Sequence, residues 1–139
     1  MNIVSEHRFR SDLAETVHLG RWLEAFARQA QLSPTLKSAL DHALVESVTN
    51  VITHGCNDGG EHWVTVRFRA TPNEARVEIE DDGHAFDPRT VPPVDVTAPL
   101  ETRDIGGLGV HMIRQLMDSV EYRREHGRNI LTLIKRRAT

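Results

Sequence analysis

Three polar side chains interrupt an otherwise apolar stretch at intervals of four residues. The stretch is ALVESVTNVITHG, residues 43–55, and the three residues are Glu46, Asn50 and His54. Because residues four apart lie nearly above one another on a helix, they form one stripe. A carboxylate beside a carboxamide supplies oxygen ligands that suit Mg²⁺, and Glu46 is equally suited to act as a general base. The structural alternative is a solvent-facing polar stripe, although its neighbours are Val, Thr and Ser rather than Lys and Glu.

A second candidate closes the segment ARVEIEDDG, residues 75–83. In an extended strand Asp81 continues the apolar phase of this segment, whereas Asp82 points to the opposite face. A carboxylate that points inward must find a hydrogen-bond donor. The donor is either the backbone of the following turn or the amino group of a ligand, and Gly83 allows a ligand to approach closely.

A third candidate is the sequence GGLG, residues 106–109, at the start of an expected helix. Glycines let the backbone approach a ligand, and the free N–H groups of a helix start favour phosphate. A plain joint between a loop and a helix is the alternative. The stretch is not a P-loop, because no GK[ST] follows, and it is not a dinucleotide fingerprint, because Met112 stands where that motif needs glycine.

Hydrophobic periodicity predicts the elements that must position these groups. We expect a strand over 2–10, a helix capped by Ser11, and a second helix from Ser33-Pro34 to about His54. A hairpin (62–70 and 75–83), a helix (106–120) and a second hairpin (118–125 and 129–136) follow. The proline-rich residues 84–105 between them are expected to form a lid. The order predicts a single α+β domain over 1–139, a two-layer sandwich with helices on one face of a mixed, mainly antiparallel sheet.

The composition excludes several classes of protein. A chain of 139 residues with a net charge of −3 lacks the basic excess of a nucleic-acid binder, so we expect no direct nucleic-acid contact. No apolar run approaches the roughly 20 residues of a membrane span, so we expect no membrane contact. The start of the chain lacks the apolar core of a signal peptide, and the single cysteine, Cys56, excludes an intrachain disulfide. We therefore expect a cytoplasmic protein.

The three candidates gain weight from their order along the chain. A helix with ExxxN, a strand end with DxG, a proline-rich lid and a GxG helix start resemble the GHKL ATPase superfamily, the Bergerat or histidine-kinase-like ATPase fold, over nearly the whole chain. Within it the chain is most similar to the free-standing anti-sigma factor serine/threonine kinases. The segments that select this branch are ESVTNVITHG, DDGHAFDP, GGLGVHMIRQLMD and GRNILTLIKR.

This resemblance implies ATP bound with Mg²⁺ between the helices and the lid. It makes Glu46 the base that activates a protein serine and Asn50 the ligand of Mg²⁺ at the phosphates. The remaining nucleotide contacts that it implies are Asp81 with Gly83 at the adenine amino group, Gly107, Leu108 and Gly109 around the phosphates, and Arg103 of the lid, which is otherwise a plain solvated loop residue. The chain departs from the superfamily pattern DxGxG at Ala85, where a methyl group replaces the last glycine; we expect binding to survive.

The family also implies partners. It implies a kinase that binds a sigma factor, phosphorylates a STAS-domain anti-anti-sigma factor on serine, and forms a homodimer. A partner-binding module with little catalysis and a lone histidine-kinase catalytic domain are the alternatives. A zinc site at His54, Cys56 and His62 lacks the usual ligand spacing, and Cys56 has no arranged base that would make it a nucleophile. We expect His54 to be structural, and Trp22 and Trp63 to pack rather than bind a ligand.

Overall fold

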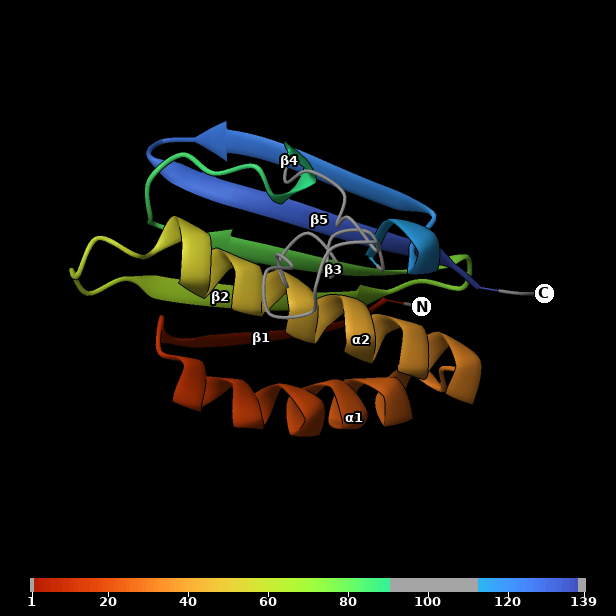
Figure 1. Ribbon diagram of the computed structural model, residues 1–139. Helices are drawn as coiled ribbons and strands as arrows, with labels where there is room; N and C mark the ends of the chain where they lie inside the picture. The colour runs from red at the N-terminus through yellow and green to blue at the C-terminus, as the bar shows by residue number, and fades with distance from the viewer. Residues whose placement is uncertain (1, 91–112, 138–139) are drawn as a thin grey trace, which may run out of the picture.

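The computed structural model of the chain describes residues 2–90 and 113–137. Five strands form one sheet in the order β1-β2-β3-β5-β4 (Figure 1). Their bounds are β1 Ile3–Arg10, β2 Trp63–Ala70, β3 Glu74–Asp81, β4 Ser119–Glu125 and β5 Arg128–Arg136. Every pairing between these strands is antiparallel, so the predicted mainly antiparallel sheet is confirmed without a parallel pair among the described strands.

The helices lie together on one face of the sheet (Figure 1). They are α1 (Leu19–Ala30) and α2 (Pro34–Asn50), preceded by the 3-10 helix η1 (Leu13–His18) and followed by the π-helical turn η2 (Val51–Gly55). A further 3-10 turn, η3 (Pro88–Thr90), begins the predicted lid. Residues 113–116 are also helical, and they are the described end of the helix predicted over 106–120. The predicted two-layer sandwich is therefore confirmed.

The start of the first helix differs from the prediction. Asp12, not Ser11, is the capping residue, and its carboxylate accepts a hydrogen bond from the Ala14 N–H at 3.0 Å. This cap begins η1, and the α-helix starts only at Leu19. The prediction for α2 is confirmed, because the Ser33 hydroxyl accepts from the Leu36 N–H at 3.1 Å and Pro34 occupies the first turn.

The core lies between the two layers. The inward residues of β2 and β3 are fully buried and alternate along each strand, which is why the apolar period of two in the sequence marks this face. Leu40, Leu44 and Val48 of α2 are likewise buried, and Phe26 of α1 stacks on Phe68 of β2 at 5.2 Å. This packing fixes α2 across the sheet and brings its C-terminal end to the end of β3.

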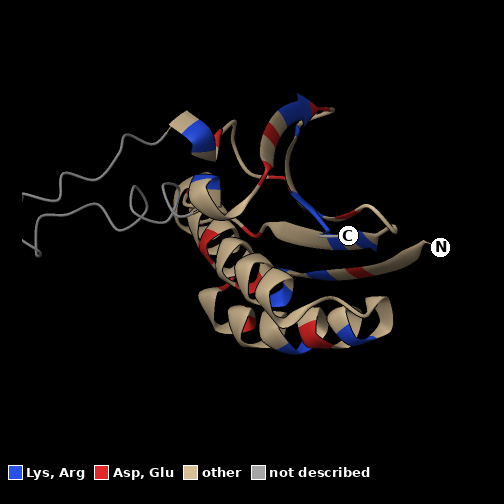
Figure 2. Cartoon of the chain, turned by 90° about the vertical axis from the view of Figure 1, so that its right-hand side faces the viewer, with Lys and Arg blue, Asp and Glu red and all other residues tan. Residues whose placement is uncertain are grey.

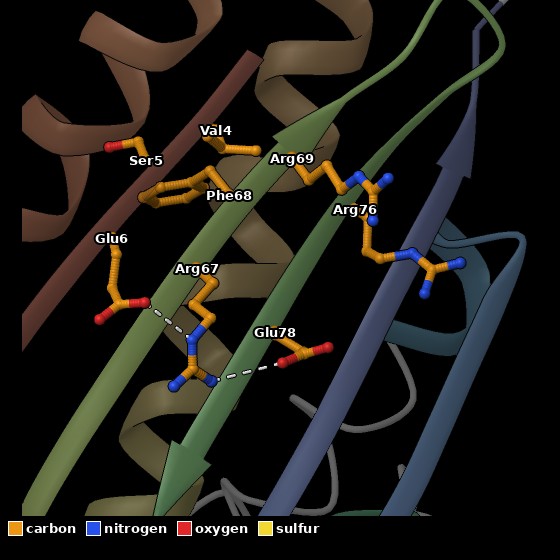
Figure 3. Close-up of a pocket in the computed structure, with 8 residues that line it drawn as sticks. All are labelled: Val4, Ser5, Glu6, Arg67, Phe68, Arg69, Arg76 and Glu78. Atoms are coloured by element: carbon orange, nitrogen blue, oxygen red, sulfur yellow. Dashed lines mark hydrogen bonds and ion pairs between the residues drawn. The ribbon is translucent and has the colours of Figure 1, made fainter. Parts of the chain in front are cut away.

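The opposite face of the sheet is open and charged. Figure 2 shows acidic and basic residues interspersed on both layers rather than gathered in one patch. A depression of about 380 Å³ lies on the open face, where Arg67 points toward Glu6 and Glu78 and donates to them at 2.9 and 3.4 Å (Figure 3). Arg67 thus pairs with acids of both neighbouring strands. The depression lies on the side of the sheet away from α2, and none of the predicted site residues lines it.

An arginine near the C-terminus ties three segments together. The Arg137 guanidinium donates to the carbonyls of Thr71, Ala30 and Gln31 at 3.2, 3.0 and 3.1 Å. Two of these carbonyls are at the C-terminal end of α1, where carbonyl groups lack helical partners. The same side chain therefore caps α1 and attaches it to the β2–β3 turn.

We expect Arg137→Ala to lower the free energy of unfolding by about 1–3 kcal/mol, because it removes charge-assisted hydrogen bonds to three backbone carbonyls, two of them part-buried. Arg136→Ala is the matched control. The Arg136 side chain is exposed, and its loss should change stability by less than about 0.5 kcal/mol. Urea denaturation of the two variants measures the difference, and equal midpoints would contradict the role given to Arg137.

Candidate active site

Glu46 and Asn50 occupy successive turns of α2, as their spacing predicts. Glu46 is half-buried, whereas only 2% of Asn50 is exposed. His42, one turn before Glu46, is exposed. The stripe therefore becomes more buried toward the C-terminal end of the helix, and at Asn50 it is not the solvent-facing stripe that was the structural alternative.

The Asn50 carboxamide is buried with an unused donor. Its Nδ2 has no hydrogen-bond partner among residues 2–90 and 113–137, and neither has the nearby Ser47 hydroxyl. A buried polar group without a partner costs roughly 1–3 kcal/mol, so such a group calls for an explanation. A ligand that accepts a hydrogen bond from Nδ2 provides one. A hard carboxamide oxygen one turn from a carboxylate fits Mg²⁺, which prefers oxygen ligands and needs few from the protein.

Immediately after Asn50 the helix changes its hydrogen-bonding pattern. The Cys56 N–H donates to the Val51 carbonyl at 3.1 Å, which closes the π-helical turn η2. Such turns are rare and occur frequently at functional sites. The turn ends at Gly55, whose carbonyl accepts from the His84 N–H at 3.1 Å. The end of the helix is thereby joined directly to the segment that follows β3.

Asp81 lies at the end of β3 with its carboxylate inside the molecule, as the strand phase predicts. Only 3% of the residue is exposed. Its Oδ1 accepts from the Gly83 N–H at 2.9 Å and from Asn129 Nδ2 at 3.0 Å. Burial raises the pKa of Asp81, and these two donors oppose the rise. Its other oxygen accepts no hydrogen bond from the described residues and remains available to a ligand amino group.

Gly83 is required by the protein itself. A Cβ atom at this position would lie 2.1 Å from the Gly55 carbonyl oxygen, closer than any side chain tolerates, and 3.0 Å from Asp81 Oδ1. From the sequence, Gly83 is predicted to allow a ligand to approach closely. The contact with Gly55 supplies a structural reason in addition, and the role of Gly83 beside a ligand stays a prediction.

Asn129 is a buried polar residue of the site that the sequence interpretation missed. It lies on β5 opposite Asp81 and is 3% exposed. The signal was present in the sequence, because Asn129 is a polar residue in the inward phase that it shares with the buried Leu131 and Leu133. A buried carboxamide in an apolar phase must be hydrogen-bonded or bound to a ligand.

His54 and Trp22 take the structural roles that the sequence predicts. His54 packs its ring against Phe86 at 5.5 Å, and Trp22 stacks on His7 at 4.4 Å, so both make packing contacts.

Burial, followed by the charge of Asp81, raises the pKa of the Cys56 thiol to about 12, which keeps it protonated and unreactive at neutral pH. Residues 2–90 and 113–137 contain no group of three or more His, Cys, Asp or Glu side chains arranged for a metal. Arg103, Gly107, Leu108 and Gly109 lie outside the described residues.

The arrangement agrees with a known family of domains. The sequence profile described as the histidine kinase-like ATPase domain matches residues 9–135. The chain belongs to the histidine kinase-like ATPase domain family.

Characterised relatives place this ATPase-domain protein more narrowly. It is 30% identical to the serine/threonine-protein kinase BtrW of Bordetella bronchiseptica, with 81% of this chain and 79% of that protein covered. It is 31% identical to the serine-protein kinase RsbW of Listeria monocytogenes, with 84% and 78% covered. These similarities confirm the predicted membership of the anti-sigma factor serine/threonine-protein kinases, and the chain is a protein serine/threonine kinase.

Solved structures agree on the fold. The histidine kinase domain of the blue-light activated kinase from Erythrobacter litoralis superposes with a TM-score of 0.53 at 17% identity, with 86% of this chain and 59% of that chain covered. The histidine kinase AdeS of Acinetobacter baumannii gives a TM-score of 0.51 at 19% identity, with 97% and 68% covered.

Across the described part of this ATPase-domain protein, no helix has the length and apolar character to cross a membrane.

A histidine clamps the loop between η2 and β2 to the end of β3. His62 lies between two carboxylates, with Nε2 2.7 Å from Asp58 Oδ1 and Nδ1 3.1 Å from Asp82 Oδ1. Both ring nitrogens donate only in the imidazolium form. The hydrogen bond to Asp58, followed by the one to Asp82, raises the pKa of His62. In its protonated form His62 thus holds the loop next to Asp81.

This clamp predicts a pH dependence of stability. A pKa that is higher in the folded than in the unfolded state gives a stabilisation that is fully present below the unfolded value of about 6.5 and is lost as pH rises through the folded value. We expect His62→Gln to abolish this decline above pH of about 6.5, whereas His126→Asn, in the exposed hairpin turn, should keep it. Urea denaturation across this range measures both, and a decline that persists in His62→Gln would refute the clamp.

Proposed function

We propose that this chain uses ATP and Mg²⁺ to phosphorylate a STAS-domain anti-anti-sigma factor on serine and that it also binds a sigma factor. Phosphorylation of the antagonist then decides which of the two partners the kinase holds. The observation that carries the proposal is the placement of Asn50 and Glu46 on successive turns of one helix. Asn50 is buried with a donor that no described residue engages, and Glu46 is half-buried. The similarity to the kinases BtrW and RsbW supports it.

The chemistry assigns a different task to each residue. Glu46 accepts the proton of the substrate serine hydroxyl as its oxygen attacks the γ-phosphorus, and ADP leaves with the electrons of the broken P–O bond. Asn50 holds Mg²⁺, which supplies neutralisation of the phosphate charge. Asp81 receives the adenine amino group, with Gly83 beside it. Their separation on α2 and β3 lets one nucleotide be held at both ends.

Residues outside the described part complete the proposal. Gly107, Leu108 and Gly109 hold the phosphates through backbone N–H groups, and Arg103 contributes a positive charge from the lid, which spans about 84–105. The kinase acts as a homodimer in the cytoplasm, as one domain over 1–139. It contacts neither nucleic acid nor membrane. The family resemblance supports these parts of the proposal.

The test is a transfer assay with defined substrates. The purified chain, Mg²⁺ and ATP labelled at the γ-phosphate are incubated with each purified STAS-domain protein of the source organism. We expect acid-stable phosphoserine on one of them, dependent on Mg²⁺ and absent with Asp81→Ala. Acid-labile phosphohistidine would indicate a histidine kinase instead. Stable capture of a STAS-domain protein without label would indicate a non-catalytic binding module.

A further inference from the structure

Asn129 makes five hydrogen bonds, which is more than any other described side chain near Asp81. Its Nδ2 donates to Asp81 Oδ1 at 3.0 Å and to the His84 carbonyl at 2.8 Å. Its Oδ1 accepts from the Tyr122 hydroxyl at 2.5 Å, from Arg124 Nη1 at 3.0 Å and from the Phe86 N–H at 3.3 Å. Both ends of this buried carboxamide are fully occupied.

The network fixes which way the carboxamide faces. Arg124 and the Phe86 N–H can only donate, so they must meet the oxygen of Asn129. The His84 carbonyl can only accept, and so can ionised Asp81, so they must meet the nitrogen. Turning the amide by 180° would set donors against donors and acceptors against acceptors. Asn129 is therefore held in one orientation by residues of β3, β4 and the segment that follows β3.

The same carboxamide joins two parts of the site. Asp81 ends β3, whereas His84 and Phe86 form the first residues of the predicted lid. Because the carboxamide is planar and its hydrogen bonds are directional, a shift of residues 84–86 would break the hydrogen bonds of Asn129 either to that segment or to Asp81. The two segments are thereby coupled through one side chain of a neighbouring strand.

We propose that Asn129 is a positioning residue that orients Asp81 toward the amino group of the nucleotide base and links this recognition to the start of the lid. The inference rests on the proposed function, because it takes Asp81 as the residue that contacts the base. Asn129 occupies Oδ1 of the carboxylate and leaves the other oxygen as the acceptor for the ligand. It acts through Asp81 and does not itself contact the nucleotide.

The experiment compares two nucleotides that differ at one group. ATP and purine riboside 5′-triphosphate, which lacks the 6-amino group, are titrated with Mg²⁺ into wild-type protein and Asn129→Ala. We expect the wild-type preference for ATP to fall by about tenfold in the variant, the effect of losing one oriented hydrogen bond. The affinity for purine riboside triphosphate should stay within about twofold, because that nucleotide does not use the amino-group contact.

Two further measurements separate positioning from general weakening. The Asn129 hydrogen bond opposes the rise in the pKa of Asp81, so in Asn129→Ala the loss of ATP affinity on acidification should begin at higher pH. Hydrogen exchange should report that ATP protects the Phe86 amide in the wild type and not in the variant. Thr132→Val is the matched control, because Thr132 is also buried on β5 but belongs to the opposite strand phase, and it should leave the preference unchanged.

The outcomes decide between the inference and the proposed function. An unchanged preference for ATP in folded Asn129→Ala, or an equal loss of both nucleotides, would overturn the inference and leave the kinase proposal intact. Wild-type protein that binds neither nucleotide would overturn both. If Asn129→Ala does not fold, Tyr122→Phe takes its place, since it removes one of the donors that hold Asn129. A preference unchanged in that variant would likewise overturn the inference.

Discussion

Replacing Glu46 by glutamine is expected to reduce phosphoryl transfer to the antagonist by about 100- to 10,000-fold, the usual contribution of a general base. Glutamine keeps the size and the hydrogen-bonding reach of the side chain but cannot accept the serine proton. Since the proposed nucleotide contacts are made by Asn50 and Asp81, the affinity for ATP should change little. The variant should therefore bind substrate and nucleotide and fail in the chemical step.

Single-turnover transfer from γ-labelled ATP measures the rate, and calorimetric titration with ATP measures the affinity. Asp41→Asn is the matched control, because it removes another carboxylate of α2 that lies on a different side of the helix from Glu46. It should leave both quantities near the wild-type values. Transfer by Glu46→Gln at the wild-type rate would exclude Glu46 as the base, and a parallel loss of ATP affinity would show that it binds nucleotide instead.

The second large effect is expected from Gly83→Ala. The added methyl group would lie 2.1 Å from the Gly55 carbonyl oxygen, and a backbone atom cannot move aside as a flexible side chain can. We expect a loss of about 3 kcal/mol in the free energy of unfolding, at the upper end of the cost of overpacking. Because relief of the contact must move either the end of η2 or the segment after Asp81, the affinity for ATP should fall as well.

Gly20→Ala provides the comparison. Gly20 lies in α1 with no atom within 4 Å of a Cβ built there, so alanine should stabilise the protein by about 0.5–1 kcal/mol through its higher helix propensity. Urea denaturation of the two variants should therefore give shifts of opposite sign. A Gly83→Ala variant as stable as the wild type would mean that the η2 turn yields readily, contrary to the contact described here.

The regular elements and the position of Asp81 could be predicted because they follow from periodicity. A strand phase assigns each side chain to one face, and the apolar face of β3 leads directly to a buried Asp81. The start of α2 was equally readable from Ser33 and Pro34. The start of α1 was not, because Ser11 and Asp12 are neighbouring capping residues and only the extended backbone at Asp12 decides between them.

The buried carboxamides of Asn50 and Asn129 show which features of the site could not be predicted from the sequence. A spacing of four places Glu46 and Asn50 on one line, but the degree of burial along that line depends on what packs over each turn. Asn129 stands in a readable inward phase, yet its partners come from β3, β4 and the segment after β3. Contacts between residues this far apart in the chain are set by the fold. The π-helical turn likewise could not be predicted, because no residue pattern indicates such a turn.

That turn has a consequence for how the two ends of the proposed site are spaced. It carries the backbone from Asn50, the proposed ligand of the metal, to Gly55, which rests against Gly83 beside Asp81. The turn therefore acts as a spacer of fixed length between the phosphate end and the base end of one nucleotide. Deleting a residue from the turn would restore regular α-helical hydrogen bonds. It would also change the spacing between Asn50 and Gly55, so that one nucleotide could no longer be held at both ends. The irregular hydrogen bonding of η2 thus lowers local stability but positions the two ends of the proposed binding site.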